Sequence, residues 1–136
     1  MRALLDNNLP PALAHALHEL SNASEAVPVF HLTDRFEKTA ADADWLNTLG
    51  AEGNWIVVSH DKFRKGKLEM RALQRSGVKA FILEKAWSNH RFWEKSYNLV
   101  RWWPAILEQA QRAHGSLVLL VPWQFSGKGK FKQPLT

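Results

Sequence analysis

A regular alternation of short apolar runs with longer segments of helical spacing constrains the fold more than any other feature. The runs read RALL, VPVFHL, NWIVVS, VKAFIL and SLVLLV. Runs of this length bounded by turn residues are typical of strands. The predicted strands are residues 2–5, 27–32, 54–59, 78–83 and 116–121.

The segments between these runs carry start and stop signals for helices. The proline pair at residues 10–11 stands at the start of the first segment, where proline is tolerated. Acidic residues open the second segment, and Gly77 ends the third. The predicted helices are residues 10–20, 42–53, 67–77 and about 89–113.

This order of elements predicts the architecture. Strands alternating with helices form right-handed crossovers, which give a mostly parallel sheet covered on both faces. The expected fold class is α/β, a three-layer α/β/α sandwich around a sheet of about five strands. At 136 residues the chain has the size of one domain. We expect this domain at residues 1–124 and a basic, disordered tail at residues 125–136.

Composition restricts the classes of protein to which the chain can belong. No apolar run approaches the roughly 18 residues of a membrane span, so we expect a soluble protein with no membrane partner. The apolar run near the N-terminus is too short for a secretory signal. The chain has no cysteine, which excludes disulfides and is compatible with a cytoplasmic location. The formal net charge of +5 favours a polyanionic partner such as nucleic acid.

Acidic residues gather at one predicted edge of the sheet. In an open parallel sheet, ligands bind outside the carboxyl ends of the strands. Asp6 follows the first strand and Asp61 follows the third. Asp42 and Asp44 open one crossover helix, and Glu69 lies in the first turns of the next. Because crossover helices run antiparallel to their strands, all five acids are predicted to converge on this edge.

Convergent carboxylates repel one another, so such a site needs a cation or protons to be stable. Mg²⁺ or Mn²⁺ is the usual cation where all the ligands are hard oxygens. Asn7, Asn8 and Ser59 lie beside the acids and offer further oxygen atoms. Zinc is not expected, because nothing places a third ligand near His15 and His18.

Each acid except Asp61 also has a plain structural interpretation. Asp42 or Asp44 could cap a helix, and Asp6 could form an Asx-turn before the proline pair. Glu69 could be an exposed helix residue. Asp42 and Asp44 cannot both point inward, because positions i and i+2 diverge by about 200° around a helix. Asp42 shares its face with Trp45 and is the first choice as a metal ligand.

Four segments together resemble a known family. They read LLDNNLPPALAHAL, ADADWLNTLG, WIVVSHDKF and LEMRALQRSGVKAFIL. Their order resembles the PIN-like domains, and within them the small bacterial branch similar to VapC-type toxins of toxin–antitoxin pairs. The resemblance covers about residues 2–84 and implies a Mg²⁺- or Mn²⁺-dependent ribonuclease. It also implies RNA as substrate, a neutralising antitoxin as partner, and homodimers.

The resemblance assigns roles to individual residues. Asp6 and Asp61 match the acids that end two strands, and Asp42 matches the acid that opens the intervening helix. Ser59 matches the Ser or Thr two residues before the last acid. Better-studied PIN nucleases place a fourth acid in a further segment, and here only Glu69 is available for it. This departure puts two-metal catalysis in doubt.

A basic stretch follows Asp61 directly. If the chain is a ribonuclease, this stretch would hold substrate phosphates beside a negative metal site that could not attract RNA by itself. The alternative is a solvated basic loop with no partner. The candidate phosphate contacts are Lys62, Arg64, Lys65 and Lys67.

The tryptophans of the C-terminal third have two interpretations. They could stack on the bases of RNA. More often such residues fill a core or a subunit interface. The four considered are Trp87, Trp93, Trp102 and Trp103.

Two other functions compete with the nuclease. The first is a non-catalytic module that binds nucleic acid or protein on a degenerate PIN-like fold, because fewer than four acids are secure. The second is a phospho-accepting signalling domain with Asp61 as acceptor. Against the second, only one acid follows the first strand, and no lysine stands at residues 121–123 after the fifth.

Overall fold

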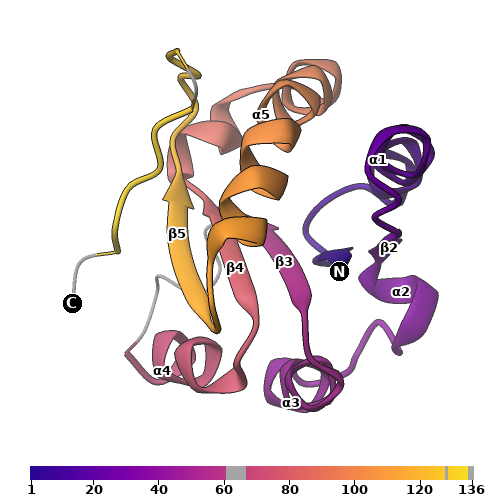
Figure 1. Ribbon diagram of the computed structural model, residues 1–136, viewed down its shortest axis with the longest axis vertical. Coiled ribbons are helices and arrows are strands. Elements are labelled where there is room, and N and C mark those ends of the chain that lie inside the picture. Colours follow the sequence, from indigo (N-terminus) through magenta and orange to yellow (C-terminus); the bar gives the residue numbers. More distant parts are fainter. Residues whose placement is uncertain (61–66, 128, 135–136) are drawn as a thin grey trace.

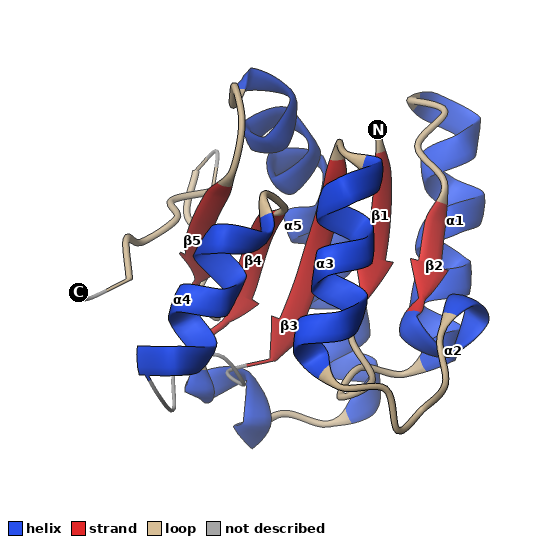
Figure 2. Cartoon of the chain, turned by 90° about the horizontal axis from the view of Figure 1, so that it is seen from below, coloured by secondary structure: helices blue, strands red, loops and turns tan. Residues whose placement is uncertain are grey.

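The computed structural model describes residues 1–60, 67–127 and 129–134. Five strands within these residues form one sheet, in the order β2-β1-β3-β4-β5. All neighbouring strands pair in parallel, and Figure 2 shows their arrows pointing the same way. The predicted α/β fold with a five-stranded parallel sheet is confirmed. The strands are β1 (Arg2–Leu5), β2 (Val29–His31), β3 (Trp55–His60), β4 (Lys79–Leu83) and β5 (Leu117–Val121).

Helices cover both faces of the sheet, as predicted. Figure 1 shows α1 and α5 on one side of the sheet and α3 and α4 on the other. No helix in the described part of the chain is long and apolar enough to cross a membrane. The helices are α1 (Pro11–Ser24), α2 (Leu32–Arg35), α3 (Asp42–Glu52), α4 (Lys67–Ser76), the 3-10 helix η1 (Lys85–Asn89) and α5 (Phe92–Arg112).

The core consists of two apolar layers, one on each face. Successive strand residues point to opposite faces, so Ile56 and Val58 pack toward α1 and α5 while Val57 packs toward α3 and α4. Trp45 of α3 is completely buried in the second layer. Both faces of the sheet are therefore covered by packed apolar side chains.

The tryptophans of the C-terminal third divide into two groups. Trp87, Trp102 and Trp103 lie in the core and are at most 4% exposed. Trp93 is 75% exposed. The core interpretation therefore holds for three of the four, and Trp93 requires a different explanation.

The described part of the C-terminal tail runs back along β5 (Figure 1). Leu120 and Lys132 exchange two backbone hydrogen bonds of 2.7 and 2.9 Å. The ring of Phe131 lies 5.3 Å from the ring of Phe81 and 5.2 Å from that of Trp102. The sequence predicts a disordered tail, whereas these contacts hold its described part against the core. Burial of the Phe131 ring favours this position. The domain boundary at residue 124 stays a prediction.

Candidate functional site

The register of the sheet brings two candidate residues together. Leu5 at the end of β1 pairs with Val58 of β3, so Asp6 and Ser59 continue side by side. The Asp6 N–H donates to the Val58 carbonyl over 2.9 Å, which extends the β1 ladder by one bond. This is the carboxyl edge of the sheet, as the sequence predicted.

Asp6 is a completely buried carboxylate at this edge. Its Oδ2 accepts a hydrogen bond of 2.8 Å from the hydroxyl of Ser59, which is also completely buried. Its Oδ1 accepts a bond of 2.6 Å from the Asn7 backbone N–H. A buried charge is costly unless it is compensated, and these donors supply part of the compensation.

Asn8 joins the loop after β1 to the end of β3. Its Nδ2 donates to the His60 carbonyl over 2.9 Å, and its Oδ1 accepts from the His60 N–H over 3.2 Å. The same Nδ2 lies 3.5 Å from the Ser59 hydroxyl. The predicted supporting residues Asn7, Asn8 and Ser59 therefore do surround Asp6.

The other described acids do not complete a cluster with Asp6. Asp42 is half-buried at the start of α3, and its Oδ1 accepts a 3.1 Å bond from the Trp45 indole N–H. Asp44 and Glu69 are exposed in the first turns of α3 and α4. Among the described residues, no three histidine or acidic side chains lie close enough together to hold one metal ion.

The remaining candidate residues fall outside the described part of the chain. These are Asp61, Lys62, Arg64 and Lys65, in the segment between β3 and α4. Lys67 is described only as the first backbone position of α4. Their predicted roles as metal ligand and phosphate contacts stay predictions.

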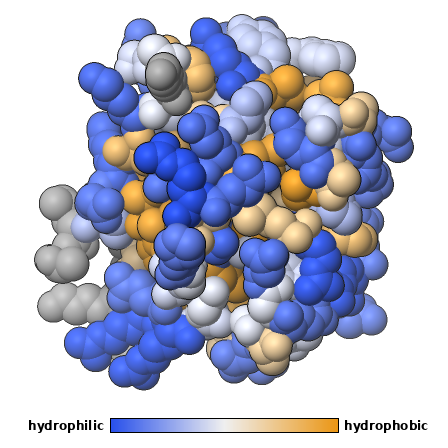
Figure 3. All heavy atoms as spheres, in the orientation of Figure 1, coloured by the Kyte–Doolittle hydropathy of each residue, from blue (hydrophilic) through white to orange (hydrophobic). Residues whose placement is uncertain are grey.

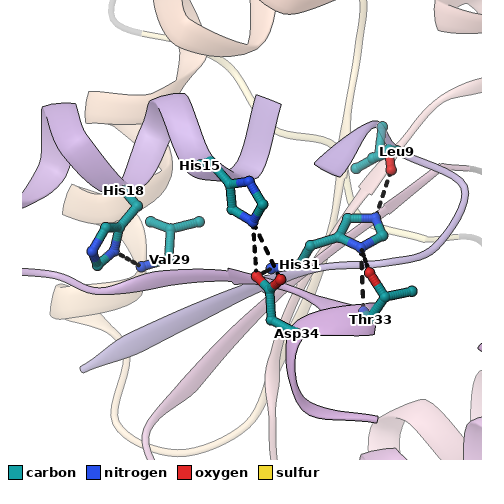
Figure 4. Close-up of polar contacts among 7 residues, drawn as sticks. All are labelled: Leu9, His15, His18, Val29, His31, Thr33 and Asp34. Carbon is teal, nitrogen blue, oxygen red and sulfur yellow. Dashed lines mark hydrogen bonds and ion pairs between the residues drawn. The ribbon is translucent and has the colours of Figure 1, made fainter. Parts of the chain in front are cut away.

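His31 is a residue that the sequence interpretation missed. It ends β2 and is 1% exposed. Its Nε2 lies 2.7 Å from the Leu9 carbonyl, in the loop that carries Asp6 and Asn8 (Figure 4). Its Nδ1 accepts a 3.2 Å bond from the Thr33 N–H, so Nε2 carries the proton and donates to Leu9. The only sequence signal is a histidine near the end of an apolar run, followed by Leu32 and then by the polar residues Thr33 and Asp34.

A second set of contacts holds His31 itself. Asp34 accepts a 2.8 Å bond from the His31 N–H and lies 3.0 Å from Nε2 of His15 on α1. Burial raises the pKa of Asp34, but the His31 N–H and the His15 ring outweigh burial and lower it overall. On the same helix, His18 Nδ1 accepts a 3.0 Å bond from the Val29 N–H (Figure 4). Helix α1, β2 and the loop after β1 are thus linked through polar side chains.

The described residues fit part of a divalent-metal site. Asp6 offers a carboxylate and Asn8 and Ser59 offer oxygens on the same edge, which is the hard-oxygen chemistry that Mg²⁺ and Mn²⁺ require. A second acid is needed to balance the charge of the ion. Asp61, one residue beyond β3, is the acid nearest in sequence to Ser59 and His60 at this edge.

Comparison with known protein families identifies the family to which the chain belongs. A family model described as "PIN like domain" matches residues 1–85, which is more than half of the chain. The chain belongs to the PIN-like domain family. No curated protein and no solved structure matched it.

The PIN-like match spans the elements that build the site. It includes β1 to β4 and therefore Asp6, Asp42, Asp61 and Glu69. PIN domains are generally nucleases, so the chain has a nuclease-type fold. Helix α5 and strand β5 lie beyond the match and are the part of this PIN-like protein that the family model does not describe.

Proposed function

We propose that this PIN-like protein is a metal-dependent endoribonuclease, with Mg²⁺ or Mn²⁺ held by carboxylates at the carboxyl edge of the sheet. The observation that carries the proposal is the completely buried Asp6 carboxylate, held by Ser59 at the end of the neighbouring strand. The chain belongs to a family of generally nucleolytic domains, and its buried acid lies at the edge of the sheet where ligands bind. Both observations favour hydrolysis of phosphodiester bonds.

The proposed metal ligands are Asp6 and Asp61, with Asp42 as the third acid. Ser59 orients the Asp6 carboxylate, and Asn8 fixes the loop after β1 to β3. Glu69 is the candidate fourth ligand, and Asp44 is the alternative to Asp42. Exposure of Glu69 and Asp44 leaves them available to an incoming ion or substrate.

If bound by these carboxylates, a divalent metal would supply an activated water and a positive charge beside the leaving oxygen. The contribution of the chain is to hold carboxylates in place before substrate arrives. In this proposal Lys62, Arg64, Lys65 and Lys67 bind the flanking phosphates, because a negative metal site would otherwise repel RNA.

The biological role in this proposal is that of the toxin in a type II toxin–antitoxin pair, acting in the cytoplasm. The sequence resemblance to VapC-type toxins supports it, and a partner antitoxin protein would then control the activity. A small DNA-binding protein encoded directly beside this chain would support the role further.

A second candidate is a non-catalytic module that binds nucleic acid or protein. The absence of a three-acid cluster among the described residues is the observation that favours it. The two candidates differ in one respect that can be measured, since only the nuclease changes its substrate covalently.

Cleavage of a mixed RNA pool by the purified chain, with Mg²⁺, Mn²⁺ or chelator, separates the two. We expect cutting that requires metal and falls by at least about a hundredfold in Asp6→Asn and Asp61→Asn. Glu19→Gln, on the exposed face of α1, is the matched control and should cut like the wild type. RNA that is bound but not cut with either metal would favour the binding module.

A further inference from the structure

Three aromatic side chains at the start of α5 face solvent. Trp93 is 75% exposed, Tyr97 60% and Phe92 46%. We call these three residues the aromatic platform. Figure 3 shows apolar side chains at the surface between α1 and α5, the two helices that also line a groove described below. A contiguous set of exposed rings marks a binding surface, because aromatic groups gain most from leaving water.

The platform lies at the same edge of the sheet as Asp6. Trp123 stands two residues beyond β5, and its carbonyl accepts a 2.9 Å bond from Nδ2 of Asn98 in α5. The His90 ring stacks on the Trp123 ring, with centroids 3.5 Å apart and planes within 6°. These contacts tie the first turns of α5 to the carboxyl end of β5. The carboxyl end of the sheet is also where Asp6 and Ser59 lie.

The spacing of the rings suits stacking. Trp93 and Tyr97 are four residues apart in a helix, so their side chains lie on one face, with Cβ atoms about 6 Å apart. Phe92 packs edge-on against Trp93, with centroids 5.6 Å apart and planes at 85°. Phe92 therefore supports Trp93 from the side and leaves a face of the indole open.

Charge around the platform is mainly positive. Lys85, Arg91 and Arg101 are exposed in the segment that contains it. The acid of this segment, Glu94, accepts a 2.9 Å bond from the Arg91 N–H and lies 3.8 Å from His90. Positive side chains beside open rings match a partner that has both phosphates and flat bases.

The neighbouring apolar groove has a different character. It lies between α1 and α5, farther along both helices, and has a volume of about 130 Å³. Aliphatic side chains such as Leu17, Leu20 and Leu107 line it, together with Glu25. A mostly apolar groove that offers no cationic side chain among its described lining residues does not suit a polyanion, so the aromatic platform is the part of this surface that fits RNA.

We propose that the aromatic platform binds the bases of single-stranded RNA, with bases stacked on Trp93 and Tyr97. The inference rests on the proposed function for the identity of the substrate. The platform gives affinity without sequence preference, because every base has a π-face. It would hold the RNA strand at the edge of the sheet that carries Asp6, while basic side chains neutralise the phosphates of the RNA.

The test is fluorescence anisotropy with a labelled oligouridylate of about twelve nucleotides in chelator, so that no cleavage occurs. We expect Trp93→Ala and Tyr97→Ala each to raise the Kd by about 5- to 100-fold, and Trp93→Phe to keep most of the affinity. An abasic oligomer of equal length should bind wild type and variants alike. Leu20→Ala, an apolar residue 53% exposed outside the platform, is the control and should bind as the wild type does.

Several results would overturn the inference. These are a wild type that binds no oligoribonucleotide, or platform variants whose Kd stays within about twofold of the wild type. A wild-type dimer that the platform variants dissociate, with RNA affinity unchanged, would assign the surface to a second copy of the chain. RNA held by the platform but never cut with metal would refute the nuclease and leave the platform standing. If the chain cuts RNA with metal and the platform variants bind RNA as the wild type does, the nuclease stands and the platform is refuted.

Discussion

At the residue scale, His31 is the buried side chain that connects three parts of the candidate site. It donates to Leu9 in the Asp6 loop and accepts from Thr33 at the start of α2. Loss of a buried hydrogen bond costs about 1–3 kcal/mol when it leaves one partner unsatisfied. We therefore expect His31 to position the loop, although it holds neither metal nor substrate.

Two substitutions can separate these bonds. Glutamine can place its amide nitrogen near the position of Nε2 and keep the donor to Leu9, whereas asparagine can replace only the Nδ1 acceptor. We expect His31→Asn to accelerate amide hydrogen exchange at Leu9, whose N–H donates to the backbone carbonyl of Asp6 over 3.0 Å, and His31→Gln to accelerate it less. RNA cleavage should fall in the same order. Equal exchange at Leu9 in the two variants would show that His31 serves only the α2 end.

Asp34 gives the link between α1 and α2 a defined pH dependence. Despite burial, bonds from the His31 N–H and the His15 ring hold its pKa below the ordinary value near 3.8. A carboxyl whose pKa is lowered by folding stabilises the native state above its unfolded pKa, and the contribution disappears as pH falls through the folded pKa. The side chain is 34% exposed, so the contribution should be less than about 1 kcal/mol.

The corresponding variant is Asp34→Asn, measured by urea unfolding. It should be less stable than the wild type near neutral pH, and the difference should shrink as pH falls below about 3.8. Some acid sensitivity should persist in the variant, because Arg35 and the Trp55 indole N–H lower the pKa of Glu52, which remains in place. A constant difference across this range would contradict the assignment.

At the scale of elements, the strands and the longer helices could be predicted. The hydrophobic period of each segment agrees with the turn and capping residues that bound it. Each predicted strand overlaps an observed one, from β1 to β5. Helix α2 and η1 could not be predicted, because they span only four and five residues and form through local contacts. One such contact is the reciprocal cap between His31 and Asp34.

The candidate site could be predicted only where strands alone determine it. Asp6 and Ser59 follow paired strands, so the edge rule places them together. Asp42 and Glu69 stand on helices, and a sequence pattern does not determine how far a helix begins from a strand end. In the sequence His31 looks like any histidine near the end of an apolar run, because its partner Leu9 lies 22 residues away.

Gly50 is a point of close approach between α3 and α4, which lie on the same face of the sheet. A Cβ at this position in α3 would overlap the carbonyl oxygen of Ser76 at the end of α4. Alanine normally stabilises a helix interior relative to glycine by about 1 kcal/mol. Here we expect Gly50→Ala to lower the free energy of unfolding by about 2–4 kcal/mol, because the backbone must move.

The matched control for this clash is Gly53→Ala at the end of α3. Gly53 has a φ of 81° and a ψ of 154°, a conformation open almost only to glycine, and nothing lies within 4 Å of an added Cβ. The cost is therefore backbone strain without a clash, about 1–3 kcal/mol. Urea unfolding measures both. If Gly50→Ala were as stable as the wild type, α3 and α4 could not pack as described.

At the scale of the whole molecule, the C-terminal third completes a fold whose first 85 residues match the family. Strand β5 extends the sheet, and the tail pairs with it at Leu120 and Lys132. A paired edge is protected from association with other chains. The tail therefore has a structural role as well as a basic composition.

Substitution of Phe131 tests this structural role of the tail. Its ring contacts Phe81 and Trp102, and burial of an aromatic side chain contributes about 1.5–3 kcal/mol when it is complete. Because Phe131 is partly buried, we expect Phe131→Ala to lower the free energy of unfolding by about 1–2 kcal/mol. Lys130→Ala, at an exposed position, should change it by less than about 0.5 kcal/mol. If the Phe131 variant were as stable as the Lys130 variant, Phe131 would not contribute to stability. That result would support the expectation of a disordered tail.

The central claim is that the edge holding Asp6 binds a divalent metal for cleavage of RNA. Titration of Mn²⁺ into the metal-free chain, followed by electron paramagnetic resonance, tests it directly, with Asp6→Asn and Asp61→Asn beside the wild type and Glu19→Gln as control. We predict that the wild type and the control bind Mn²⁺ and that each acid variant binds at least about tenfold more weakly while remaining folded. Equal Mn²⁺ affinity in the wild type and in folded Asp6→Asn would contradict the account.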